Sequence, residues 1–151
     1  MPAKPEIVTI GLVQMRCQDD PEANLVKAVT GIRQAAAQNA DIVCLQELFR
    51  SCYFCQGQDS RNFDLAEPID GPTIKRLSQV AQETGTAIIA PFFERRTAGV
   101  YHNSAALIER DGSFSACTEK CISRMIRCTL RSTTSLQGTW ASAFSRLIAG
   151  Q

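Results

Sequence analysis

The stretch Asp41-Ile42-Val43-Cys44-Leu45-Gln46-Glu47 decides the fold assignment, because an apolar run of β-strand character leads directly into a carboxylate. An unpaired carboxylate at the edge of a core costs roughly several kcal/mol, so a glutamate at this point indicates a purpose. Open α/β sheets carry their sites outside the carboxyl ends of their strands, where Glu47 would serve as a catalytic base. A surface-loop carboxylate without a chemical role explains the spacing equally well.

The residues before this strand predict a β-α-β unit. Ile7–Val13 is a short β-rich run, and Asp20 followed by Pro21 is typical of a helix N-cap and first helical position. Four apolar residues then recur at spacings of four, three and four, as one buried helix face requires: Leu25, Val29, Ile32 and Ala36. With Asn39 closing the helix, the strands at 7–13 and 41–45 are expected to be parallel neighbours.

The rest of the first 116 residues continues this alternation. A long polar loop over 49–71 is expected to be functional, since loops of that length are uncommon in compact domains. A second helix opens at Pro72, with its C-terminal cap at Gly85 and one buried face of Ile74, Leu77, Ala81 and Thr84. Strands follow at 86–93 and 101–109, and a tight turn at Asp111-Gly112. The predicted class is α/β, with helices on one face of the sheet and another sheet beneath it.

Bulk composition narrows the function classes. The chain has 151 residues, 44% of them hydrophobic and 21% charged, which is ordinary for a single globular domain. A formal net charge of +1 gives no reason to expect nucleic acid or a membrane surface as a partner. No signal peptide and no apolar run near the roughly 20 residues of a membrane span are evident. Seven cysteines, an odd number, favour a reduced, cytoplasmic protein.

Five ordered segments between about Ile7 and Phe114 resemble the nitrilase, or carbon–nitrogen hydrolase, superfamily. They are Leu45–Phe49, Tyr53–Gln56, Asn62–Pro68, Phe93–Arg96 and Tyr101–Ala105. The resemblance is greatest to amidases that act on small N-carbamoyl amines. It implies the N-terminal part of an α-β-β-α sandwich, as a partial domain over 1–116.

The resemblance also implies a Glu-Lys-Cys triad that hydrolyses linear C–N bonds through a thiol-bound acyl intermediate, with no metal or other cofactor. A thiol is mostly protonated at neutral pH, so a carboxylate must accept its proton, and a lysine ammonium then stabilises the oxyanion. Glu47 matches the general base, Lys120 falls at the place of the lysine, and Tyr53 and Phe54 match substrate-binding positions. Members of the superfamily commonly form homo-oligomers. The resemblance therefore leaves a homo-oligomer open for this chain, although the departure from the family after residue 116 disfavours one.

That departure concerns the nucleophile. The family expects Tyr-Arg-Lys-x-His-Ile-Pro where Thr118–Arg124 stands, and a later Cys-Trp pair that this sequence lacks. Permitted codons for Thr118–Ser142, translated one base earlier, spell a segment close to the family's, with Lys120 conserved because adenine-rich codons encode lysine in both frames. We therefore interpret 117–151 as a frame-shifted, basic, Ser/Thr-rich tail that is poorly ordered, and the chain as a truncated, inactive amidase. The alternative is a non-catalytic remnant or interaction fragment.

Several other residues admit a plainer interpretation. Cys52 and Cys55 form a Cys-x-x-Cys pair, but a zinc site needs about four ligands, so buried small residues in a substrate loop are favoured. Tyr53 and Phe54 could line a pocket or fill the core. His102, the only histidine, is expected to be a hydrogen-bonded core residue.

Two further polar residues lie at predicted strands. Glu94 is expected to pair with Arg95 or Arg96 rather than to join the site. Asn103 is expected to hold a neighbouring loop in place through hydrogen bonds of its side-chain amide.

Overall fold

A computed structural model describes residues 7–55 and 59–121 of the chain, with side chains up to residue 114. Its elements, in chain order, are β1 (Ile10–Val13), α1 (Pro21–Ala36), β2 (Ile42–Leu45), η1 (Ser60–Leu65), α2 (Pro72–Thr84), β3 (Ala87–Thr97), β4 (Val100–Ile108) and β5 (Phe114–Cys121).

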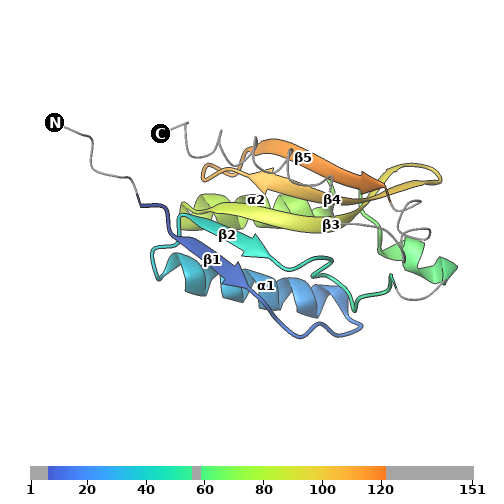
Figure 1. The fold of residues 1–151 in the computed structure, drawn as a ribbon, viewed down its shortest axis with the longest axis horizontal. Helices are drawn as coiled ribbons and strands as arrows, with labels where there is room; N and C mark the ends of the chain where they lie inside the picture. The colour runs from blue at the N-terminus through green and yellow to red at the C-terminus, as the bar shows by residue number, and fades with distance from the viewer. Residues whose placement is uncertain (1–6, 56–58, 122–151) are drawn as a thin grey trace.

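The strands form one five-stranded mixed sheet in the order β1-β2-β3-β4-β5 (Figure 1). The first three are parallel, with Ile10 beside Ile42 and Ile42 beside Ala87, whereas β3, β4 and β5 are antiparallel. The predicted β-α-β unit is therefore confirmed, with its two strands parallel and adjacent. Parallel neighbours place the carboxyl ends of β1, β2 and β3 at one end of the sheet, which is where Glu47 follows β2.

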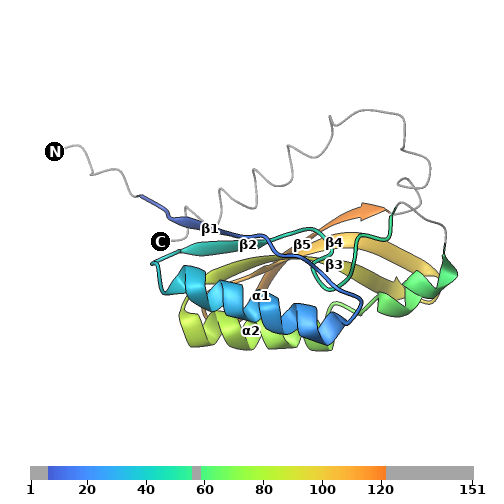
Figure 2. The same cartoon turned by 90° about the horizontal axis from the view of Figure 1, so that it is seen from below.

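Both helices cover the same face of the sheet (Figure 2). Helix α1 begins at the predicted N-cap, since the carboxylate of Asp20 accepts hydrogen bonds from two backbone N–H groups of the first turn. The main core lies between the helices and this face, and it includes Leu25, Val29, Ile32, Leu77 and Ala81 from the predicted stripes. Ala36 and Thr84, the last members of those stripes, are half-buried.

Strand β2 shows how the sheet serves two layers. Val43 and Leu45 point into the helix-side core, while Ile42 and Cys44 pack on the opposite face with residues of neighbouring strands: Val8, Ala87, Ile89 and Leu107. The described residues thus comprise one helical layer and one mixed sheet, which is the N-terminal part of the layered architecture that the sequence predicts. The second sheet is not among them.

Several details differ from the sequence prediction, among them the end of β3, which reaches Thr97 rather than residue 93. Strand β1 begins at Ile10 rather than Ile7, the loop at 49–71 contains the 3₁₀ helix η1, and strand β5, which was not predicted, crosses the proposed boundary at residue 116. Polar residues in β5 hide its strand character, because its pairing with β4 comes from backbone hydrogen bonds rather than from an apolar pattern. The tail from residue 122 onward lies outside the described residues, so its predicted disorder stays a prediction.

Candidate active site

The segment that presents Glu47 is fixed first by its neighbour Gln46. The Gln46 side-chain oxygen accepts a hydrogen bond of 2.6 Å from the backbone N–H of Met15, and its amide nitrogen lies 3.1 Å from the sulfur of Cys17. Both partners belong to the loop that leaves β1. Gln46 therefore joins the carboxyl ends of β1 and β2 immediately before the glutamate.

The carboxylate of Glu47 is held from a different strand. The side-chain amide of Asn103 in β4 donates a hydrogen bond of 2.5 Å to Oε1 of Glu47. Asn103 is buried at 8% exposure, whereas Glu47 is exposed. Asn103 was predicted to hold a neighbouring loop in place, and this prediction is confirmed: the residue that it holds is Glu47. A polar amide at a predicted strand position was the signal for it.

The backbone turns sharply directly after the glutamate. Leu48 adopts a φ of +52°, a left-handed conformation that costs a branched, non-glycine residue of order 1–3 kcal/mol. Its side chain is only 3% exposed and packs against Ala66 and Phe93, which offsets that cost. The turn buries Leu48 while Glu47 stays at the surface, a feature that sequence reasoning missed.

An aromatic cluster forms one wall beside the carboxylate. Phe54 packs on Phe93 with ring centroids 5.2 Å apart, and Phe63 of η1 lies 4.5 Å from Tyr101. Phe93 is the cross-strand neighbour of Asn103, so the cluster and the Glu47 contact share one face of the sheet. These contacts favour the core-filling interpretation of Phe54.

Tyr53 has a different environment from Phe54. It is 52% exposed, and desolvation, together with the nearby Cys55 and the charge of Glu47, raises the pKa of its phenol. Tyr53 therefore lies near the carboxylate with its hydroxyl protonated at neutral pH. Contact of either Tyr53 or Phe54 with a substrate stays a prediction.

Lys120 is placed by strand pairing. Its backbone lies in β5, directly in register with Asn103 of β4. Since Asn103 also contacts Glu47, the positions 47 and 120 are both adjacent to one buried asparagine.

The remaining polar candidates have structural partners. Glu94 is 3% exposed and accepts a 2.5 Å hydrogen bond from the hydroxyl of Ser104. Its carboxylate also pairs with the guanidinium of Arg96 at 3.0 Å. The predicted ion pair is therefore confirmed, and its partner is Arg96 rather than Arg95. His102 is half-buried and lies opposite Glu94 in the β3–β4 pair.

Cys17 and Cys52, which lie next to each other in this region, have raised pKa values. Burial raises the pKa of Cys17, and desolvation together with Asp19 raises that of Cys52. Cys52 is exposed, contrary to the burial that we expected, and its thiol lies 3.7 Å from the backbone oxygen of Cys17. Lys27 near Cys17 and Arg16 near Cys52 oppose these shifts without overcoming them, so neither thiol has the lowered pKa that favours a reactive thiolate.

This combination of a mixed α/β sheet and a glutamate at the end of its second strand agrees with comparisons to known proteins. The family model "Carbon-nitrogen hydrolase" matches residues 9–137, so the chain belongs to the carbon-nitrogen hydrolase family. A carbon-nitrogen hydrolase structure from Helicobacter pylori superimposes with a TM-score of 0.70 at 31% identity, over 75% of this chain and 39% of that one.

Two curated relatives refine the comparison. The chain is 39% identical over 114 residues to N-carbamoylputrescine amidase of Solanum lycopersicum, covering 75% of this chain and 38% of that protein. It is 38% identical over 107 residues to citrullinase of Francisella tularensis, covering 70% and 37%. The chain therefore spans well under half the length of these relatives. Within the described ranges, neither helix combines the length and the apolar character that a bilayer-spanning segment needs.

Proposed function

We propose that this chain carries the base-bearing part of a cytoplasmic amidase that hydrolyses a linear ureido compound, with N-carbamoylputrescine as the substrate and putrescine, carbon dioxide and ammonia as products. The hydrogen bond from buried Asn103 to Glu47 is the observation that supports it best, because it orients a surface carboxylate at the end of a parallel strand. The relatives' names support the substrate class, since N-carbamoylputrescine and citrulline both end in a ureido group.

The proposed roles follow from the chemistry of ureido hydrolysis. Glu47 accepts the proton of a cysteine thiol, whose sulfur attacks the ureido carbon, and the Lys120 ammonium stabilises the resulting oxyanion. Glu47 then returns the proton to the departing amine and later activates the water that hydrolyses the carbamoyl thioester. With Oε1 held by Asn103, Oε2 is the oxygen left to move the proton. Tyr53 and Phe54 border the site on the substrate side.

We further propose that the chain does not complete this reaction alone. The sequence contains no Cys-Trp pair at which the family's nucleophile would stand. Loss of a nucleophile that acts as a unit with its base typically costs roughly a million-fold in rate. Purified chain incubated with N-carbamoylputrescine should therefore release no putrescine above the uncatalysed background. Turnover that disappears in Glu47→Ala would contradict this proposal.

A chimaera tests the proposed roles directly. Residues 1–116 would be joined in frame to the corresponding C-terminal part of the N-carbamoylputrescine amidase of Solanum lycopersicum, the tomato enzyme. This part restores the lysine and cysteine motifs. We expect putrescine release from N-carbamoylputrescine, loss of at least about a thousand-fold in Glu47→Gln, and little change in Asp70→Asn, an exposed control carboxylate. A chimaera whose activity survives Glu47→Gln would exclude Glu47 as the base. Sequencing the gene beyond codon 110 tests the frame-shift interpretation separately.

A second candidate function is association with an intact member of the family. Two exposed apolar side chains favour it: Leu12 on the edge strand β1 is 79% exposed, and Val26 on α1 is 66% exposed. Exposed apolar residues on an edge strand are typical of surfaces that pair with another chain. Co-sedimentation with the tomato enzyme, at a ratio that saturates, would support this candidate. Independent sedimentation of the two proteins would exclude it.

A further inference from the structure

The chain that follows Glu47 forms a tight turn whose backbone is attached to α1. The backbone N–H of Ser51 donates a 3.0 Å hydrogen bond to the oxygen of Leu48, which closes the turn. The buried side-chain amide of Asn24 in α1 donates a 2.9 Å hydrogen bond to the backbone oxygen of Arg50. The main chain of Arg50 is thus fixed from α1, while its side chain extends toward a different element.

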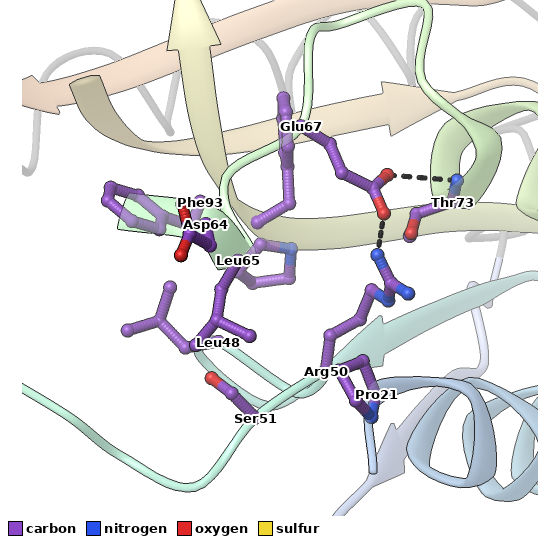
Figure 3. Close-up of a pocket in the computed structure, with 11 residues that line it drawn as sticks. Pro21, Leu48, Arg50, Ser51, Asp64, Leu65, Glu67, Thr73 and Phe93 are labelled. Atoms are coloured by element: carbon purple, nitrogen blue, oxygen red, sulfur yellow. Dashed lines mark hydrogen bonds and ion pairs between the residues drawn. The ribbon is translucent and has the colours of Figure 1, made fainter. Parts of the chain in front are cut away.

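The guanidinium of Arg50 forms ion pairs with two carboxylates, one of which is shielded from water. Glu67 is the shielded partner: its side chain is 14% exposed, and Figure 3 shows the Arg50 side chain directed at its Oε1. Glu22 is the other partner, and its side chain is 72% exposed. Water and salt screen an exposed ion pair strongly, so the pair with Glu67 determines where the guanidinium lies.

Glu67 is itself fixed by the N-terminus of α2 (Figure 3). Its Oε2 accepts a 3.0 Å hydrogen bond from the backbone N–H of Thr73 in the first helical turn. The N-cap residue, Gly71, has no side chain to accept this bond, and a Cβ there would lie only 3.0 Å from Oε2 of Glu67. The missing side chain leaves the capping position to Glu67, whose negative charge also suits the positive end of the helix dipole.

We propose that Arg50 and Glu67 are positioning residues for Glu47, because they attach the turn behind it to the N-terminus of α2. The left-handed backbone of Leu48 is costly, so the turn keeps this shape only while the surrounding contacts hold it. The contact between Asn103 and Oε1 of Glu47 depends on the same turn, since Glu47 directly precedes Leu48. A fixed orientation matters because Glu47 is proposed to transfer protons, so the role of the pair rests on that proposed function.

The side-chain amide of Asn103 reports on this pair in ¹H–¹⁵N NMR spectra of the full 151-residue chain. Glu47→Ala removes the acceptor and gives the resonance position of the unbound amide. Glu67→Gln keeps an acceptor for the Thr73 N–H but turns an NH₂ group, which cannot accept a hydrogen bond, toward Arg50. We expect Glu67→Gln to shift the Asn103 resonances to the Glu47→Ala position.

Three variants at the other end of the ion pair complete the test. Arg50→Met removes the guanidinium and should reproduce the shift of Glu67→Gln. Arg50→Lys keeps a positive charge for Glu67 and should retain the wild-type Asn103 resonances. Glu22→Gln is the matched control, because it removes only the exposed partner of Arg50 and should leave those resonances unchanged.

Wild-type Asn103 resonances in Glu67→Gln or in Arg50→Met would overturn the proposal, and so would an equal shift in Glu22→Gln. Loss of the dispersed backbone signals of β3 and β4 in Glu67→Gln would show that the pair supports the whole sheet rather than Glu47, and would overturn it as well. The spectra detect a contact and not turnover. They can therefore contradict the role of the pair while Glu47 remains the base, and the chimaera can lack activity while the contact persists.

Discussion

At the scale of single residues, Glu47 is positioned by contacts that differ in kind. A hydrogen bond from Asn103 fixes one carboxylate oxygen, and the left-handed backbone of Leu48 directs the chain back into the core immediately afterwards. Gln46 secures the preceding position to the loop after β1. An exposed carboxylate would otherwise sample several rotamers, so these contacts supply preorganisation rather than burial.

The Asn103–Glu47 contact should appear as an energetic coupling. Asn103→Ala and Glu47→Ala each remove one partner, and a double-mutant cycle isolates the pair. We expect a coupling of about 1 kcal/mol, below the roughly 1.5–3 kcal/mol of a hydrogen bond to a charged group, because Glu47 is exposed. Urea unfolding of the four proteins measures it. Additivity within about 0.3 kcal/mol would mean that the contact does not hold the carboxylate in solution.

At the scale of elements, two glycines with positive φ provide a matched comparison. Gly85 ends α2 at a φ of +64° with no atom within 4 Å of an added Cβ, whereas at Gly112, φ +82°, a Cβ would lie 2.6 Å from the backbone oxygen of Ser78. Gly85→Ala should therefore cost only the left-handed conformation, about 1–2 kcal/mol. Gly112→Ala should cost more, because the β4–β5 turn must also move away from α2. Equal losses in urea unfolding would contradict this packing.

Asp41 links the start of β2 to two other segments and should give stability a dependence on pH. Its carboxylate accepts 2.8 Å hydrogen bonds from the backbone N–H of Thr9 and from Arg110, and these lower its pKa from the ordinary value of 3.8, the Thr9 bond most. Because the folded state favours the ionised form, its contribution is complete above about pH 4. It is lost as the pH falls through the lowered folded-state pKa.

Asp41→Asn tests this linkage. The variant should be less stable than the wild type at pH 7, and the difference should shrink below about pH 4, where the wild-type carboxylate takes up its proton. Urea unfolding from pH 7 to pH 2 measures the difference, and Asp70→Asn controls for the loss of one negative charge at an exposed position. A difference that stays constant down to pH 2 would exclude Asp41 as its source.

The elements near the N-terminus were predictable because local signals and tertiary packing agree there. Asp20 marks the start of α1 and Gly85 marks the end of α2, as their capping positions predict. The apolar stripe around Leu25 predicts the face of α1 that packs in the core. Strand β5 was not predictable, since its backbone pairs with β4 without an apolar period. In the site, Glu47 was visible as an acid after an apolar strand. Its contact with Asn103 was not, because 56 residues separate partners that only the sheet order brings together.

At the scale of the whole molecule, the sheet has unequal faces, and β1 forms its outer edge among the described strands. The helix-side face carries the large core, while the opposite face has a small cluster around Ile42 and Ile89. Among the described strands β1 ends the sheet, and Ile10 and Leu12 on it are 45% and 79% exposed. A short apolar edge strand offers unpaired backbone groups together with side chains that adhere to another chain. Self-association of this protein should therefore begin at β1.

Leu12→Lys tests this origin of self-association. A lysine on an edge strand opposes pairing with a second chain, and at 79% exposure it should change the free energy of unfolding by no more than about 0.5 kcal/mol. Sedimentation velocity over a range of concentrations should show a smaller associated fraction than in the wild type. Leu25→Lys is the matched control, since Leu25 is 7% exposed inside the helix-side core and a buried charge there should unfold the domain. If Leu12→Lys associates as strongly as the wild type while remaining folded, association does not begin at β1.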